Sequence, residues 1–76
     1  MTKKFKLGQE VIFVESTIYA GDMDDYIGAI GIIESFITIG DTYDYQVLFG
    51  KDNESYLVRK DEIIKATKAA KVLYGL

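Results

Sequence analysis

The side chains that most often perform catalysis are missing from this 76-residue chain. It contains no histidine and no cysteine, so it lacks the commonest general base, the commonest metal ligand and the thiol nucleophile. Carboxylates remain, but pairs such as Asp24-Asp25 and Asp61-Glu62 fall in predicted turns, where acidic residues are common for structural reasons. The composition therefore argues against an enzyme.

The acidic segment 21–25 offers oxygen ligands of the kind that calcium prefers. It lacks the Asp-x-[Asp/Asn]-x-[Asp/Asn]-Gly spacing and the distal glutamate of a known calcium-binding loop. We therefore expect a solvated acidic loop that holds no metal, and we expect no cofactor; calcium binding by this loop is the alternative.

A long connection, residues 15–26, separates the first two predicted strands. Connections of this length are uncommon in compact domains and often bind partners. Tyrosine rings are favoured in protein interfaces, and this connection carries tyrosines among acidic residues. The predicted partner-binding residues are Tyr19, Asp22, Asp24, Asp25 and Tyr26. The alternative is that the tyrosines cover a core that contains no tryptophan.

Charge is distributed unevenly along the chain, although the net charge is only −3. Residues 7–58 hold ten acidic groups and one lysine, whereas residues 1–6 hold three lysines and residues 59–76 hold five basic and two acidic groups. Chain ends often lie close together in a small domain, so the terminal lysines can form one basic patch that binds nucleic acid. The residues of this alternative site are Lys3, Lys4, Lys6, Lys65, Lys68 and Lys71.

A run of β-branched residues interrupted by glycine, residues 26–36, predicts a long central strand. Gly28 and Gly31 are expected to mark its bend, as in the coiled strands of small barrels. Further strands are predicted at about 10–14, 43–49 and 55–59. Tyr45, Val47 and Phe49 share one parity, which predicts a buried face. Asp61 is expected to cap a single helical turn before a short last strand at 63–64.

The residues after 66 permit either a short helix or a frayed end, and Gly75 is a helix stop in the first case. We find no linker, repeat or membrane-length apolar run, so residues 1–76 are expected to form a single soluble, cytoplasmic domain. The barrel is expected to occupy about residues 5–66, followed by the tail 67–76. Together these patterns predict an all-β fold with five strands.

The pattern resembles small bacterial and phage proteins with a Src-homology-3-like (KOW- or Tudor-like) β-barrel. The residues that carry the resemblance are Phe5-x-Leu7-Gly8-x-x-Val11-x-Phe13, Gly28-x-x-Gly31-x-Ile33, Tyr45-x-Val47-x-Phe49 and Tyr56-x-Val58-x-x-Asp61-Glu62-Ile63. The resemblance implies a fold but no single activity, because such barrels bind proteins, peptides, cell-wall material, DNA or RNA through their loops. The acidic loop departs from the basic loops of RNA-binding KOW barrels, and the missing tryptophan departs from peptide-binding domains.

These observations favour a non-enzymatic interaction module, a phage or bacterial accessory protein that binds another protein through its acidic, tyrosine-bearing loop. Two alternatives stay open. One is weak binding of nucleic acid by the basic termini, and the other is an acidic inhibitor that occupies a nucleic-acid site on a host enzyme.

Overall fold

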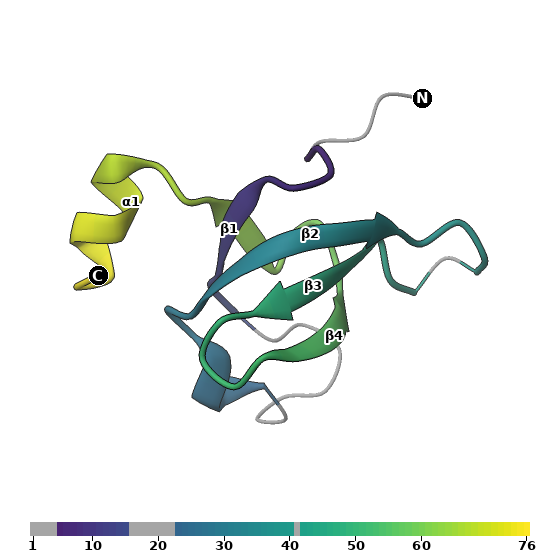
Figure 1. The fold of residues 1–76 in the computed structure, drawn as a ribbon, viewed down its shortest axis with the longest axis horizontal. Coiled ribbons are helices and arrows are strands. Elements are labelled where there is room, and N and C mark those ends of the chain that lie inside the picture. Colours follow the sequence, from purple (N-terminus) through teal and green to yellow (C-terminus); the bar gives the residue numbers. More distant parts are fainter. Residues whose placement is uncertain (1–4, 16–22, 41) are drawn as a thin grey trace.

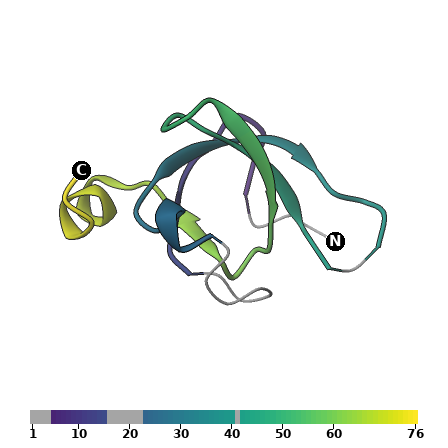
Figure 2. The ribbon, with the colours of Figure 1, turned by 90° about the horizontal axis from the view of Figure 1, so that it is seen from below.

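One antiparallel sheet followed by a short helix makes up the structure, a computed structural model that describes residues 5–15, 23–40 and 42–76. Its strands pair in the order β4-β3-β2-β1-β5. Figure 2 shows the sheet curving strongly around the core, with the C-terminal helix outside it. The elements in chain order are β1 (Glu10–Phe13), the 3-10 helix η1 (Asp24–Tyr26), β2 (Ile30–Phe36), β3 (Tyr45–Phe49), β4 (Glu54–Val58), β5 (Ile63–Lys65) and α1 (Lys68–Leu73) (Figure 1).

The five predicted strands are confirmed, and so is the predominantly β fold. Closure of the sheet into a barrel is not confirmed. Within the described residues, β4 and β5 stand at the two edges of the sheet and are not paired with each other. The described part of the chain is therefore a curved, open sheet of antiparallel strands.

The core lies on the concave face of this sheet, and β3 shows how the sequence builds it. Tyr45, Val47 and Phe49 are fully buried while their neighbours are only partly so, which confirms the predicted period of two. The Tyr45 hydroxyl accepts a hydrogen bond from the Phe5 backbone N–H at 3.2 Å, so the buried phenol is satisfied. The rest of the buried cluster consists of Phe5, Val11, Phe13, Ile33, Val58 and Ile63.

The two glycines expected to bend the central strand have different roles. Gly28 precedes β2 and has a φ of 88°, so it supplies the left-handed backbone of the turn after η1. Gly31 lies inside β2, where a Cβ would come 2.3 Å from Val47 Cγ1. The irregularity of β2 lies between Ile33 and Ser35, where the register with β3 shifts as at a β-bulge. The register shift of β2 therefore lies beyond both glycines, and Gly31 allows the close approach of β3.

Glu62 closes the turn between β4 and β5. Its Oε1 accepts from the Arg59 N–H at 2.7 Å, and its own N–H donates to the Arg59 carbonyl at 3.0 Å. Asp61, which the sequence suggested as the cap, instead lies 3.7 Å from the Arg59 guanidinium in an exposed ion pair. The prediction of an Asp61 cap is wrong because the longer, buried Glu62 side chain reaches back across the turn.

We expect Glu62→Ala to destabilise the protein by about 1–2 kcal/mol, since it leaves the Arg59 N–H without its charged acceptor. Asp61→Ala is the matched control, because an exposed ion pair contributes about 0–1 kcal/mol. Urea unfolding of the two variants measures both changes, and equal losses would contradict the assignment of Glu62 as the cap.

The tail forms a helix rather than a frayed end. Thr67 Oγ1 accepts from the Ala70 N–H at 3.1 Å and caps the start of α1. Gly75, with a φ of 73°, ends it, and the Leu76 N–H donates to the Lys71 carbonyl at 2.7 Å. This pair of features is the Schellman motif, which reverses the chain after a helix. The described residues include no helix with the length and apolar character needed to cross a bilayer.

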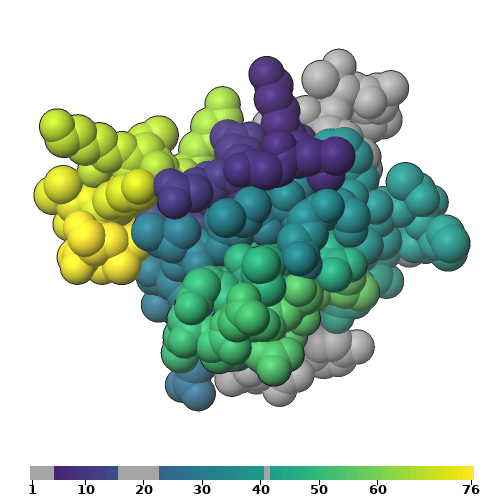
Figure 3. Space-filling model, in the orientation of Figure 1, coloured from purple at the N-terminus to yellow at the C-terminus, as the bar shows by residue number. Residues whose placement is uncertain are grey.

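The tail returns to the convex face of the sheet. Lys71 pairs with Glu10 of β1 at 3.0 Å, and a Cβ on Gly28 would lie 3.7 Å from the Tyr74 ring. Ile12 pairs with Ile30 on this face and is nevertheless 0% exposed, although it lies outside the main core cluster. In the space-filling view the yellow tail lies against the purple and blue segments that contain β1 and the start of β2 (Figure 3). The tail therefore covers part of the outer face.

Candidate functional site

The segment that holds the predicted site is fixed to β1 by its backbone. The Gly28 N–H donates to the Phe13 carbonyl at 2.8 Å, and the Phe13 N–H donates to the Ala29 carbonyl at 3.1 Å. Within η1, the Tyr26 N–H donates to the Met23 carbonyl at 2.9 Å. Asp24 and Asp25 fall in the first turn of η1 and are exposed. The backbone thus presents two carboxylates outward while Tyr26 turns toward the sheet.

The Tyr26 ring lies against two aromatic residues of β3 and β4. Its centroid is 5.0 Å from Phe49 and 5.0 Å from Tyr56, in tilted and edge-on geometries that aromatic rings favour. The Tyr26 hydroxyl donates to the Asp52 carboxylate, and it shares a hydrogen bond with the Tyr56 hydroxyl 3.0 Å away. We call Tyr26, Tyr56 and Asp52, together with Lys51, the tyrosine cluster. Both rings are half-buried, so each presents an edge and a hydroxyl to the surface.

The turn between β3 and β4, residues 50–53, supplies the charged members of the cluster. Asn53 adopts a left-handed φ of 58°, and Asp52 Oδ1 accepts from the Glu54 N–H at 3.1 Å. One carboxylate oxygen of Asp52 therefore accepts from the backbone of the turn, and the other accepts from the Tyr26 hydroxyl. Lys51 Nζ donates to the Asp25 carbonyl at 2.6 Å and lies 4.8 Å from the centre of the Tyr26 ring. The turn and η1 are thus joined through side chains.

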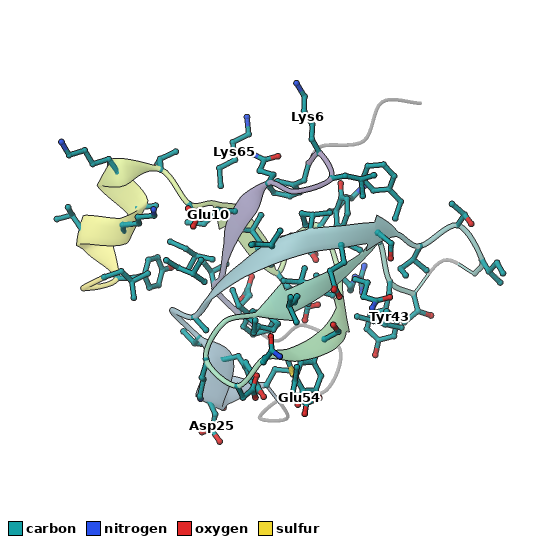
Figure 4. The ribbon with its side chains drawn as sticks, viewed as in Figure 1. Lys6, Glu10, Asp25, Tyr43, Glu54 and Lys65 are labelled. Atoms are coloured by element: carbon teal, nitrogen blue, oxygen red, sulfur yellow. The ribbon has the colours of Figure 1, made fainter. Side chains whose placement is uncertain are left out.

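Acidic groups dominate the surface around the cluster. Among the side chains that the structure describes, Asp24, Asp25, Asp52 and Glu54 are all exposed there, and Lys51 is the one cation beside them. Figure 4 places Asp25 and Glu54 at one end of the molecule, with Lys6 and Lys65 at the opposite end. Exposed carboxylates therefore gather at the end that holds the tyrosine cluster.

The hydroxyl of Tyr26 is held in its neutral form. Its pKa is raised above the ordinary value of 10.0, first because it donates to the Asp52 carboxylate, then through the Tyr56 contact and partial desolvation. A raised pKa means that the stabilisation from this hydrogen bond is fully present below the ordinary pKa and is lost as pH rises through the raised one. At neutral pH the phenol is a hydrogen-bond donor and has no proton-accepting role as a phenolate.

We expect Asp52→Asn to lower the pKa of Tyr26 toward its ordinary value, because the negative charge that opposes ionisation is removed. The asparagine oxygen can still accept from the Glu54 N–H, so the turn is preserved. Ultraviolet titration of tyrosine ionisation measures the change. Glu54→Gln is the control, since it removes a neighbouring carboxylate that does not contribute to the raised pKa of Tyr26, and a Tyr26 pKa unchanged by Asp52→Asn would contradict the assignment.

The structure brings together part of the predicted partner site. Asp24, Asp25 and Tyr26 share η1, whereas Tyr19 and Asp22 lie outside the described residues. The sequence did not indicate Lys51, Asp52 or Tyr56 as site residues. Residues 50–54 were recognisable as a polar turn, but no spacing rule connects them to a loop about 26 residues earlier in the chain.

The predicted lysine site is only partly assembled. Lys6, Lys65 and Lys68 are exposed, and Lys6 and Lys65 project from the same edge of the molecule in Figure 4. Lys71 is paired with Glu10 instead, and Lys3 and Lys4 lie outside the described residues. Among the residues that the structure describes, no group of three or more side chains is arranged to hold a metal ion.

The comparisons with known proteins found no counterpart for this arrangement. No protein-family model, no curated protein and no solved structure matched the chain. The geometry defines a small, curved antiparallel sheet with an acidic aromatic cluster at one end.

Proposed function

We propose that this protein is a non-enzymatic interaction module that binds a basic segment of a protein partner through the tyrosine cluster and the adjoining Asp24 and Asp25. The observation that carries the proposal is the immobilisation of Tyr26, whose ring is packed by Phe49 and Tyr56 and whose hydroxyl is bound by Asp52. Rigid, half-exposed tyrosines lose little conformational entropy on binding, which is why they are common in interfaces.

The position of Lys51 supports a cationic group as the element that is recognised. Its ammonium lies over the Tyr26 ring and donates to the Asp25 carbonyl, so the cluster already accommodates one cation. The surrounding exposed carboxylates attract further positive charge and raise the rate of encounter with a basic partner. A lysine- or arginine-bearing segment complements both features.

We also propose that the fold is a Src-homology-3-like barrel. Three features support this assignment: the strand order β4-β3-β2-β1-β5, the long connection between β1 and β2, and the tight turn between β3 and β4. The strong curvature seen in Figure 2 fits a sheet that encloses its own core. On such a fold the loops carry the function, which agrees with a site formed by η1 and the β3–β4 turn.

The proposal is tested by NMR titration with short peptides of equal length, one rich in lysine and arginine and one rich in glutamate. We expect amide shifts in residues 24–26 and 51–56 with the basic peptide alone, and weaker binding at higher salt. The double variant Asp24→Asn/Asp25→Asn should weaken binding, whereas Asp61→Asn, an exposed acid at the β4–β5 turn, should not. Equal binding of both peptides, or shifts confined to other residues, would refute the proposal.

A second candidate function, weak binding of nucleic acid, is favoured by the shared direction of Lys6 and Lys65 in Figure 4. Phosphate contacts of this kind weaken steeply with salt. We expect Lys6→Gln/Lys65→Gln to abolish retention on heparin and electrophoretic shifts of DNA or RNA if this function exists. A wild-type protein that shows no shift at low salt and micromolar concentration would rule it out.

A further inference from the structure

An apolar hollow lies on the convex face of the sheet, between the start of β2 and the end of the tail. Its volume is about 550 Å³, and its apolar lining comes from Ile27, Ile30, Ile32 and Leu76, together with Ala29 and Gly31. Leu76 reaches the hollow because the Schellman turn at Gly75 reverses the chain after α1. The hollow is therefore a product of the packing of the tail on the sheet.

The charged residues around the hollow form a defined pattern. Glu10, Asp25 and Lys51 contribute to its wall. Glu10 is paired with Lys71 of α1 in the same chain, which shows that a lysine of this helix fits beside this wall. The Asp25 carboxylate is exposed and leaves one acidic position open to a positive group from outside.

Next to the hollow, α1 carries aliphatic side chains that the tail does not bury. Val72 is 73% exposed and Leu73 is 79% exposed, and no residue of α1 is fully buried. Single exposed aliphatic residues need no explanation, but these two lie in the same short segment as Leu76, and Ile27 and Ile32 of the hollow are exposed as well. Several exposed aliphatic residues on neighbouring segments are typical of an interaction site.

We propose that the occupant of the hollow is a second copy of this chain, whose α1 inserts Leu73 and Val72 while its own hollow receives the same side chains in return. A two-fold interface requires one surface to carry both a protrusion and its complement, and here α1 and the hollow adjoin at Leu76. The charges agree with the pairing, because α1 also carries the exposed Lys68, which can approach the open Asp25 carboxylate. The two identical contacts together cover the aliphatic surface of both copies.

The proposal is tested on the whole chain by sedimentation equilibrium over a range of protein concentrations. We expect a reversible dimer that Leu73→Gln and Ile32→Gln each weaken about tenfold or more, since each removes a central apolar contact. Both positions are exposed in the single chain, so circular dichroism should show intact folding. Ile39→Gln is the matched control, because Ile39 is 90% exposed but lies in the β2–β3 loop, and this variant should dimerise like the wild type.

Mixing the two weakened variants tests the reciprocal geometry. In a mixed dimer of Leu73→Gln and Ile32→Gln chains, one of the two contacts joins an intact Leu73 to an intact hollow, whereas neither variant alone can form an intact contact. We therefore expect the mixture to associate more strongly than either variant by itself. A wild-type chain that stays monomeric at all concentrations would overturn the proposal. A dimer that depends on Ile39, or one that tolerates both substitutions, would also overturn it, because the hollow would then have another occupant or none. The measurement needs no partner peptide, so its outcome is independent of the proposed function.

Discussion

The Phe49→Ala variant should lose about 3–5 kcal/mol of stability, a large part of the roughly 4–11 kcal/mol expected for a chain of this length. Phe49 is fully buried, with its ring 6.2 Å from Phe13 in an edge-on pair. Its ring also lies near those of Tyr26 and Tyr56, at 5.0 and 6.2 Å, so truncation opens a cavity beside the tyrosine cluster. Urea unfolding should show the midpoint falling by about 3 M or more if the slope is near 1 kcal/mol per M.

Two further variants separate the loss of packing from other effects. Ile39→Ala truncates a side chain that is 90% exposed and should change stability by less than about 0.5 kcal/mol. Phe49→Leu keeps most of the apolar volume, so the fold should survive while the ring contacts that hold Tyr26 are lost. A midpoint for Phe49→Ala close to that of Ile39→Ala would show that Phe49 does not join the core to the site.

The pattern of residues predicted the core better than the outer face. Alternation placed Tyr45, Val47 and Phe49 on one buried face, because side chains alternate along any strand whatever its neighbours are. The apolar character of β1 on both faces was also visible, but the sequence did not indicate where the tail lies. Its position depends on the chain reversal at Gly75 and on the pairing of Lys71 with Glu10 of β1, which are tertiary properties.

The sequence also predicted only part of the candidate site, namely the residues of η1. The acids and the tyrosine of η1 lie in a long connection, a feature that local reasoning can recognise. Their partners Lys51, Asp52 and Tyr56 are brought to them by the packing of the β3–β4 hairpin on η1. The sequence likewise does not determine whether the sheet closes into a barrel. Closure depends on whether its two edge strands, β4 and β5, meet, which is again a tertiary property.

Gly31 is required by a contact between two strands. The sequence predicted that this glycine marks a bend, and the register shift of β2 falls between Ile33 and Ser35. What requires glycine at this position is the close approach of β3, since a Cβ would lie 2.3 Å from Val47 Cγ1 and 3.1 Å from the Leu48 carbonyl oxygen. Val47 is fully buried and β-branched, and the carbonyl belongs to the paired backbone, so neither can move easily.

We therefore expect Gly31→Ala to destabilise the protein by about 1–3 kcal/mol through overpacking, even though alanine usually suits a strand better than glycine does. Gly50→Ala is the matched control, because no atom lies within 4 Å of the added Cβ and Gly50 is not among the glycines with a positive φ. That substitution should be neutral or stabilise the protein by up to about 1 kcal/mol, since it restricts only the unfolded chain. Urea unfolding should thus show a loss of stability for Gly31→Ala and no loss for Gly50→Ala. A Gly31→Ala protein as stable as the wild type would mean that β2 and β3 can separate at this point and that the glycine is not required for their packing.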